Sequence, residues 1–483
     1  MVLETKAPRM WIDGQPASAV SGKEFAVVNP ATEEELARVP EAGAEDVDRA
    51  VRAAHRAFEE GPWTRLRPRE RARCLFRLAD LIREHREPLA LLEAQNVGKP
   101  IRDARDEVGM VADCFEYYAG AVTKLFGETI PTNAPGLDFT LREPIGVCAL
   151  IVPWNFPLVI ASWKVAPALA AGNAVVLKPA SYTPLTALAL GQLAQEAGLP
   201  PGVVNVVAGP GGTVGAELVR HPLVAKVAFT GETATGRAIM GLAAEGIKRV
   251  SLELGGKSPL IVFEDTDIDQ VVESSLGVVY GNAGQDCCAR SRAFVQREVY
   301  DAFCEAFAAR SRRLRVGDPL DPETEMGPLI SGAQRERVRG YVAVGQEEGA
   351  RLLAGGGVPA GVGRGFYLDP AVFTDVTPAM RIAREEIFGP VLAVLPFTDE
   401  EPLIRAVNDS IYGLSGSIWT RDLGRALRVA RRVQTGVLSI NGSTSVHLEA
   451  PFGGYKQSGL GRELGMHALQ LYTEVKNVHI ALG

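Results

Sequence analysis

Apolar residues recur at helical spacing near the start of the chain. Over residues 45–60 and again over 69–86, apolar side chains return every three or four positions. That spacing gathers them on one face of a helix, so both segments are predicted to be amphipathic helices. Many arginines flank the second segment, and they are expected to lie on its solvated face.

From residue 145 the pattern changes to short, continuously apolar runs separated by helical segments. The runs are 147–152, 174–177, 203–207, 227–229 and 250–254. Strand-helix-strand repetition with continuously apolar strands predicts a parallel sheet covered on both faces. Such sheets bind ligands beyond the carboxyl ends of their strands, so the loops at Lys178, Gly209 and Gly231 are candidate cofactor loops.

A second alternation runs from residue 259 to about 440. Its predicted strands are 259–263, 293–296, 415–420 and 437–440, and its predicted helices are 267–280, 299–313 and 422–433. The pattern indicates a second α/β domain.

Two strands fit neither alternation. Residues 127–143 and the tail from Tyr472 to Ile480 show period-two patterning without an obvious local partner. Exposed strand edges are usually paired or covered, often by another subunit. We therefore interpret both strands as an oligomerisation arm.

Composition narrows the class of protein. A chain of 483 residues is too long for a single hydrophobic core, so more than one domain is expected. A content of 46% hydrophobic and 23% charged residues is typical of globular domains. A net charge of −7 disfavours nucleic-acid and anionic-membrane partners. The most apolar stretch, 145–177, is broken by prolines and polar residues, and the start of the chain has no secretory pattern. Six scattered cysteines without zinc-site spacing predict a reduced, cytoplasmic protein that requires no metal.

Three residues offer a candidate chemistry. Glu253 stands among glycines in Leu-Glu-Leu-Gly-Gly-Lys, Cys287 follows in Gly-Gln-Asp-Cys-Cys, and Asn155 lies upstream in Pro-Trp-Asn-Phe-Pro. Together they provide a carboxylate base, a thiol nucleophile and an amide donor. Oxidation of an aldehyde to an acid through a thioester needs those three groups.

Seven motifs carry a resemblance to the aldehyde dehydrogenase superfamily. They occur in the superfamily's order and the match extends from Trp11 to the C-terminal strand. The motifs lie at 153–157, 178–180, 229–236, 252–257, 284–287, 386–390 and 451–459. Any one of them alone would be a weak signal, but seven in order make chance negligible.

The resemblance implies an α/β fold with three parts. A Rossmann-like NAD(P)-binding domain would comprise residues 1–125 and 145–255, and an α/β catalytic domain residues 256–456. A small β oligomerisation arm would comprise 126–144 and 465–483, in a homodimer or homotetramer.

The resemblance also assigns catalytic roles. Cys287 resembles the nucleophile, with the adjacent Cys288 as its rival. Asn155 would hold the oxyanion together with the Cys287 backbone N–H, unless it is only a turn residue. Glu253 would activate water, unless it is a helix-cap or salt-bridged glutamate. This base favours a free carboxylic acid as the product.

Three further expectations concern other residues of the site. Lys164 and Glu463 resemble a proton relay, although a structural ion pair explains them equally well. Asp286 beside the nucleophile should raise the pKa of the thiol unless its carboxylate points away. Ser181 stands where NAD-preferring relatives commonly carry a glutamate, so a 2′-phosphate would meet no repulsion and NADP should be accepted.

The remaining expected contacts divide into cofactor and substrate positions. Lys178 should reach the adenine ribose, and Glu386 and Phe388 the nicotinamide ribose and ring. The cofactor positions are Ile151, Pro153, Trp154, Lys178, Ser181, Gly211, Phe229, Thr230, Gly231, Glu232, Leu254, Gly255, Glu386 and Phe388. The substrate-tunnel positions are Phe156, Trp163, Met110, Tyr117, Asp286, Cys288, His447 and Phe452.

The physiological aldehyde has several candidates. Cys-Phe-Glu-Tyr-Tyr-Ala at 114–119 resembles the amino- and betaine-aldehyde branches, but Met110 stands where some of them have a carboxylate, and Glu107 lies one turn earlier. Semialdehydes and simple aliphatic or aromatic aldehydes are alternatives. Two rival functions are a cysteine esterase or hydrolase, which would need a histidine base, and a non-catalytic structural relative.

Overall fold

The computed structural model describes residues 8–444 and 446–482, so residues 1–7, 445 and 483 of the predicted ranges lie outside it. An eight-stranded sheet forms the first layer, in the order β19-β11-β10-β7-β8-β9-β1-β2. Five central strands are parallel: β7 (Val147–Ile151), β8 (Ala174–Lys178), β9 (Val204–Val206), β10 (Val224–Thr230) and β11 (Arg249–Glu253). Antiparallel strands complete the edges: β1 (Met10–Ile12), β2 (Gln15–Ala17) and β19 (Gly459–Leu460).

Helices cover both faces of this sheet, which explains its continuously apolar strands. Along β7, Val147, Ala149 and Ile151 pack in one core cluster, whereas Cys148 and Leu150 pack in another. The first cluster includes residues of α1 (Ala44–Glu59), α7 (Ala216–Arg220) and α8 (Thr233–Ala244). The second includes residues of α2 (Pro68–Glu84), α3 (Arg86–Val97), α4 (Ile101–Ala121), α5 (Pro157–Ala170) and α6 (Leu185–Glu196). The prediction of a parallel sheet with two covered faces is therefore confirmed for its centre.

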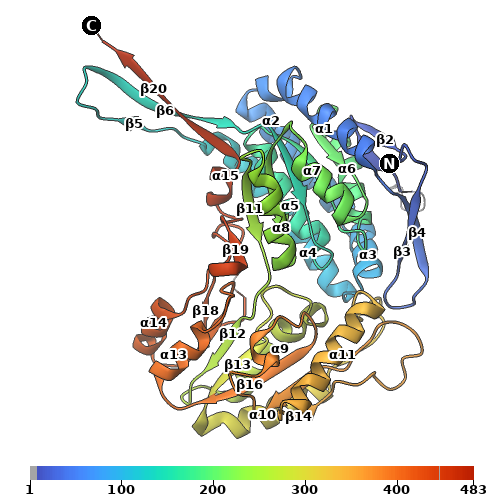
Figure 1. Cartoon of the computed structure of the whole chain (residues 1–483), viewed down its shortest axis with the longest axis vertical. Coiled ribbons are helices and arrows are strands. Elements are labelled where there is room, and N and C mark those ends of the chain that lie inside the picture. Colours follow the sequence, from blue (N-terminus) through green and yellow to red (C-terminus); the bar gives the residue numbers. More distant parts are fainter. Residues whose placement is uncertain (1–7, 445, 483) are drawn as a thin grey trace.

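A seven-stranded sheet occupies the other half of the molecule (Figure 1), in the order β14-β15-β16-β13-β12-β17-β18. Its strands are β12 (Pro259–Val262), β13 (Arg292–Gln296), β14 (Arg351–Ala354), β15 (Ala371–Thr374), β16 (Val391–Phe397), β17 (Ser417–Trp419) and β18 (Ser439–Ile440). Only β14 pairs antiparallel. Its helices are α9 (Ile268–Tyr280), α10 (Arg297–Arg312), α11 (Gly332–Glu347), α12 (Arg381–Arg384), α13 (Glu400–Asn408) and α14 (Leu423–Arg432).

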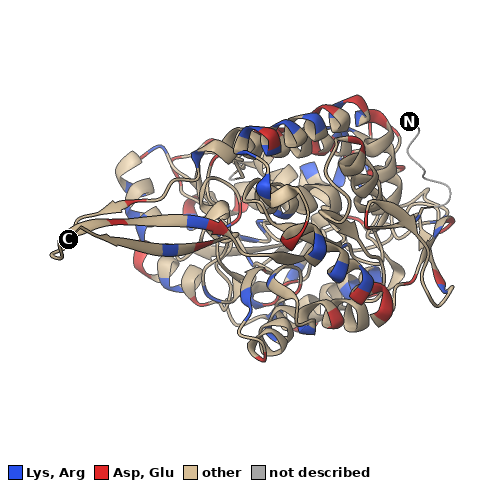
Figure 2. Ribbon diagram, turned by 90° about the horizontal axis from the view of Figure 1, so that it is seen from above, with Lys and Arg blue, Asp and Glu red and all other residues tan. Residues whose placement is uncertain are grey.

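A three-stranded arm projects from the body (Figure 1). It contains β5 (Thr129–Ile130), β6 (Gly136–Pro144) and β20 (Thr473–Ala481), which follows the short helix α15 (His467–Gln470). The two strands for which no local partner was evident pair with each other, because β6 and β20 are antiparallel along their whole length. Basic and acidic residues are interspersed along the arm (Figure 2).

Two other features complete the chain. The strands β3 (Glu24–Val28) and β4 (Glu35–Pro40) form a separate hairpin. The turn between them reaches the α11 half of the molecule (Figure 1), where the Gly365 N–H donates to Glu33. Among the described residues, no helix is both long and apolar enough to cross a membrane. The division into domains at the predicted boundaries stays a prediction.

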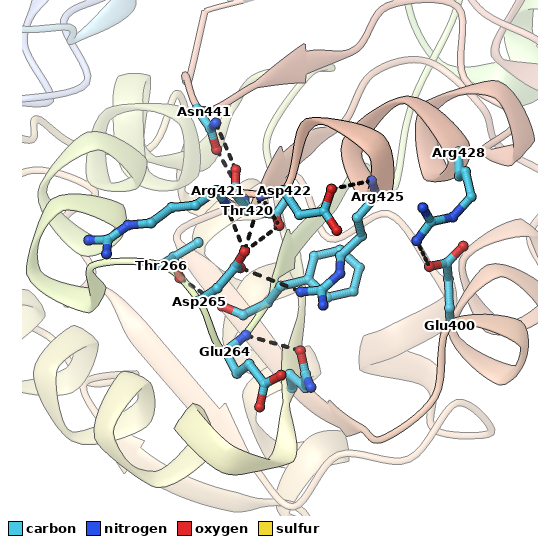
Figure 3. A network of polar contacts seen from close by, with 12 residues as sticks. Glu264, Asp265, Thr266, Glu400, Thr420, Arg421, Asp422, Arg425, Arg428 and Asn441 are labelled. Atoms are coloured by element: carbon cyan, nitrogen blue, oxygen red, sulfur yellow. Dashed lines mark hydrogen bonds and ion pairs between the residues drawn. The ribbon is translucent and has the colours of Figure 1, made fainter.

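A half-buried carboxylate connects several element ends of the second sheet (Figure 3). Asp265, just after β12, accepts hydrogen bonds from Thr420 Oγ1 at 2.9 Å and from the backbone N–H of Arg421 at 2.9 Å and Asp422 at 3.2 Å. Its other oxygen lies 3.5 Å from Arg425 Nη1. This one side chain therefore joins the end of β12 to the turn that starts α14.

Asp265→Ala should lower the free energy of unfolding by about 1–3 kcal/mol, because three donors lose their acceptor. The midpoint of urea denaturation measures the change. Glu400→Gln is the matched control, since it removes only the surface pair with Arg428, 3.2 Å apart, and should cost below about 1 kcal/mol. Equal effects of the two substitutions would show that Asp265 has no special structural role.

Candidate active site

A cavity opens where the two sheets face each other. Its walls come from the carboxyl ends of β7, β10 and β11, from the loop before β13, and from α11 and the loop before β16. The lining residues are Pro153, Trp154, Asn155, Phe156, Ile160, Thr230, Gly231, Glu232, Glu253, Leu254, Gly255, Cys287, Gln334, Arg337, Glu386 and Phe388. The cavity thus brings Cys287, Asn155 and Glu253 together although they come from three distant segments.

A strained turn presents Cys287. Asn282, Ala283 and Gly284 all have left-handed backbones, with φ of 50°, 55° and 68°. A side chain at Gly284 would collide with the Gly389 carbonyl. Gln285 holds the turn, because its amide donates to the Asn282 carbonyl and accepts from the Ile330 N–H, both at 2.9 Å. Consecutive non-glycine residues in this conformation cost free energy and are typical of functional sites.

The surroundings of Cys287 favour the protonated form of its thiol. Cys287 is half-buried, and its Sγ lies 4.0 Å from Sγ of the buried Cys288. The pKa of Cys287 is raised well above its usual range, first by the contact with Cys288, then by burial, and further by Asp286 and Glu386. The expected unfavourable effect of Asp286 is therefore present. A base or a bound cation must favour the thiolate before it can attack.

Asn155 is held by hydrogen bonds to the turn that carries the nucleophile. The side chain is 5% exposed, and its amide donates to the Gln285 carbonyl at 2.9 Å. The Asn155 carbonyl accepts from Asn282 Nδ2 at 2.9 Å. A primary amide has two N–H groups, and the second can meet an oxyanion beside Cys287. The oxyanion role of Asn155 stays a prediction that this geometry allows.

Glu253 lies at the end of β11 and faces the cavity. Its Oε2 is buried without a hydrogen-bond partner among the described residues. A Cβ at Gly453 would lie 2.7 Å from its Oε1, so a side chain there would crowd the carboxylate. Burial raises the pKa of Glu253 well above its usual range, Glu463 raises it further, and Lys164 and Arg462 oppose both. Among the described residues, Glu253 forms neither an ion pair nor a helix cap. Its free carboxylate is therefore more compatible with a general base than with either structural alternative.

Lys164 and Glu463 form a buried ion pair near Glu253. The Lys164 side chain is fully buried and its Nζ pairs with Glu463 Oε1. The other oxygen, Glu463 Oε2, has no hydrogen-bond partner in the described part of the chain. The ion pair expected as one alternative is present, and the proton relay stays a prediction.

Glu386 and Phe388 lie opposite Trp154. Glu386 accepts from the Gly256 N–H at 3.0 Å, and any side chain at Gly255 would collide with its carboxylate. Burial raises the pKa of Glu386 to about 7. The rings of Trp154 and Phe388 meet edge to face with centroids 5.2 Å apart. A carboxylate acceptor beside aromatic walls suits the hydroxyls and flat ring of a nucleotide.

Five cofactor candidates lie outside this cavity: Ile151, Lys178, Ser181, Gly211 and Phe229. They occupy the carboxyl end of the same sheet or the loops beyond it. The buried Lys178 ammonium donates to the Pro179 carbonyl at 2.8 Å, and burial lowers its pKa to about 8. Ser181 Oγ donates to the Gly209 carbonyl at 3.0 Å. A buried ammonium beside glycine backbone is suited to bind the adenosine end of a dinucleotide, which is remote from the nicotinamide.

The substrate-tunnel candidates are only partly brought together. Phe156 lines the cavity, and Asp286 and Cys288 flank the nucleophile. The buried rings of Trp163 and Phe452 pack together with centroids 5.2 Å apart. Tyr117 lines a separate surface depression, and Met110 and His447 are exposed and line neither. The expectation that all eight form one wall is not met in this structure.

Three cavity residues were missed from the sequence: Ile160, Gln334 and Arg337. Gln334 Nε2 donates to the Phe388 carbonyl at 2.7 Å, and Arg337 Nη2 donates to the Glu386 carbonyl at 3.2 Å. Both lie on α11, three residues apart and hence on one helix face. Predicting a helix over 332–347 from the sequence would have shown that Gln334 and Arg337 share one polar face.

Known proteins resemble this chain along its whole length. The sequence model of the aldehyde dehydrogenase family matches residues 17–478. Mitochondrial aldehyde dehydrogenase of Rattus norvegicus is 48% identical, over 98% of this chain and 91% of the relative. Betaine aldehyde dehydrogenase of Bacillus subtilis is 45% identical, over 97% and 96%. A Bacillus cereus aldehyde dehydrogenase solved as its NAD+ complex superposes with a TM-score of 0.97 at 47% identity, covering 100% of this chain and 98% of that one.

Proposed function

The chain belongs to the aldehyde dehydrogenase family, and from that basis we propose that it oxidises an aldehyde to a carboxylic acid with NAD or NADP as hydride acceptor. The observation that carries the proposal is the single cavity shared by Cys287, Asn155 and Glu253. Neither rival function fits as well: the cavity contains no histidine for a cysteine hydrolase, and a structural relative needs no such cluster.

Each residue has one role in the proposed reaction. After the thiol has lost its proton to a base, the Cys287 thiolate adds to the aldehyde carbon, and the Asn155 amide with the Cys287 N–H stabilises the resulting oxyanion. A bound nicotinamide supplies the hydride acceptor. Loss of hydride from the adduct leaves a thioester on Cys287. Glu253 then takes a proton from the water that hydrolyses this thioester.

A panel of aldehydes tests the proposal, with absorbance of the reduced nucleotide as readout. We expect aldehyde-dependent reduction of NAD or NADP and release of the matching acid. Acid formation without nucleotide would instead indicate the hydrolase.

We propose an apolar aldehyde as the preferred substrate, because Phe156, the substrate-tunnel candidate that lines the cavity, is aromatic and uncharged. Glu107, the carboxylate that suggested a cationic aldehyde, pairs with Lys99 and does not line the cavity. The Lys99 ammonium therefore neutralises the charge of Glu107. Amino- and betaine aldehydes belong in the same panel as the alternative.

We propose that NADP is accepted, because Ser181 puts no carboxylate beside Lys178. The values of kcat/KM for NAD and NADP should differ by less than about tenfold, or ~1.4 kcal/mol. Ser181→Glu should reduce kcat/KM for NADP at least about tenfold through charge repulsion, whereas Ser181→Ala should not. A wild-type preference for NAD above tenfold would contradict this part of the proposal.

We propose that the arm assembles a homodimer or homotetramer. Four of its apolar side chains are 42–56% exposed: Leu137, Leu141, Val475 and Ile480. Exposed apolar strands are usually covered by a partner. Val475→Asp with Ile480→Asp should convert the oligomer to smaller species in sedimentation velocity. Val358→Asp, at an equally exposed site off the arm, should leave the oligomer intact. An unchanged sedimentation coefficient for the arm variant would exclude this interface.

We also propose a cytoplasmic location, which is supported by the absence of disulfides among the described residues. All six cysteines are free, as expected in a reducing compartment.

A further inference from the structure

Three charged side chains are buried behind the segment that carries Asn155. They are Glu93 on α3, Lys99 in the turn between α3 and α4, and Glu107 on α4; we call them the buried charge cluster. Glu93 and Lys99 are each 1% exposed, and the Glu107 side chain is 13% exposed. None of them lines the cavity, and the proposed mechanism uses none of them. Buried charges are costly and call for an explanation.

Lys99 touches a wall of the cavity from behind. Its Nζ forms an ion pair with Glu107 Oε2 and lies 4.4 Å from the centroid of the Phe156 ring. An ammonium at that distance from an aromatic face is attracted to it, most strongly where water is excluded. Phe156 follows Asn155 directly and lines the cavity. The Lys99 ammonium therefore contacts, from outside the cavity, an aromatic ring that lines it.

Glu93 holds the other end of the same segment. Its Oε1 accepts from the Leu158 N–H at 3.0 Å and from Thr186 Oγ1 at 3.0 Å. Leu158 lies in the first turn of α5, where backbone N–H groups lack helical partners. Burial raises the pKa of Glu93, and the charge of Lys99 opposes that rise. The charge of Lys99 thus favours the ionised form of Glu93, whose carboxylate fixes the start of α5.

The segment 155–158 is consequently held at several points. Asn282 binds the Asn155 carbonyl, Lys99 contacts the Phe156 ring, and Glu93 binds the Leu158 N–H. A short segment fixed in this way keeps the Asn155 amide and the Phe156 ring in one relative orientation. Misplacement by about 1 Å at a reacting centre can cost as much as 10²-fold in rate.

We propose that Lys99 is a positioning residue for the aldehyde, acting through the ring of Phe156. It holds the ring so that the substrate carbonyl lies between Cys287 and the Asn155 amide. This inference rests on the proposed function, since it needs Asn155 and Phe156 to border the aldehyde.

A double-mutant cycle tests the inference. The first change is Lys99→Met with Glu107→Gln, which removes one positive and one negative charge and keeps the net charge of the cluster. The second is Phe156→Leu, which removes the ring. The readout is the rate of reduced nucleotide formation in a single turnover at saturating aldehyde. We expect the charge change to lower this rate about tenfold when Phe156 is present and less than twofold in the Phe156→Leu background.

Two controls separate positioning from general damage. Glu107→Gln alone leaves the ammonium at the ring and should change the rate less than threefold. Lys124→Met removes an exposed lysine in the turn just after α4 and should change nothing. Nucleotide affinity should stay within twofold in every variant. If the charge-pair variant does not fold, Lys99→Gln in both Phe156 backgrounds gives the same comparison, because glutamine still donates to Glu107.

The outcomes are distinct. A tenfold loss that is the same in both backgrounds, or no loss in either, overturns the inference. If wild-type enzyme oxidises no aldehyde, the proposed function itself fails, and that result is seen before any variant is made.

Discussion

Cys287→Ala is expected to abolish aldehyde oxidation, lowering kcat by about 10⁴-fold or more, whereas Cys288→Ala should retain activity. Cys287 is half-buried and lines the cavity, but Cys288 is 6% exposed and packs in the first core. The two neighbouring thiols therefore form a matched pair of substitutions. Steady-state rates with saturating aldehyde and nucleotide, together with far-UV circular dichroism for folding, provide the comparison.

Cys288→Ala should also change the reactivity of Cys287. The contact with Cys288 is the largest cause of the raised pKa of Cys287, so removing it should lower that pKa. The thiolate then forms at lower pH, and the rate of alkylation by iodoacetamide should rise at neutral pH. Dehydrogenation that survives in Cys287→Ala but disappears in Cys288→Ala would show that the assignment of the nucleophile is reversed.

Glu253→Gln should slow turnover by about 10²–10⁴-fold while leaving the first turnover largely intact. The glutamine keeps the shape of the side chain but cannot take a proton from water, so the thioester accumulates. Stopped-flow absorbance should show a burst of about one reduced nucleotide per active site, followed by a slow phase. If the burst and the slow phase were reduced equally, Glu253 would be needed before the thioester forms.

The wild-type rate should depend on pH in a defined direction. Glu253 acts as a base only when ionised, and burial and Glu463 raise its pKa well above its usual range. Hydrolysis of the thioester should therefore be slow near pH 5 and rise with pH as the carboxyl loses its proton. Glu253→Gln should lose this rise in the slow phase. A wild-type rate that is flat from pH 5 upward would contradict a raised pKa for the base.

Local patterns predicted much of the fold. The strands β7 and β8 are buried throughout, and β10 and the second half of β11 are buried over most of their length, so their apolar runs stand out from the helices between them. The pairing of β6 with β20 could not be read in this way, because it joins segments more than 300 residues apart in the chain. Strand patterning shows that an edge needs a partner but does not identify the partner.

The site was predictable where a residue type is chemically specific. Cys287, Glu253 and Asn155 fit one reaction, and the structure puts all three on one cavity. Arg337 was not foreseen as part of the site, and the contact of Lys99 behind its wall was not foreseen either, because both depend on contacts across the fold, with Glu386 and Phe156 respectively. The left-handed backbone at Asn282 and Ala283 was not foreseen either, since local sequence rarely dictates that conformation outside glycine.

Intact-protein mass spectrometry of Glu253→Gln, mixed with an aldehyde and oxidised nucleotide, tests the central claim most directly. The account predicts one added acyl group per chain, mapped to Cys287 by peptide sequencing and absent when either nucleotide or aldehyde is omitted. An acyl group on another residue, or reduced nucleotide formed with no covalent adduct at any time, would contradict it.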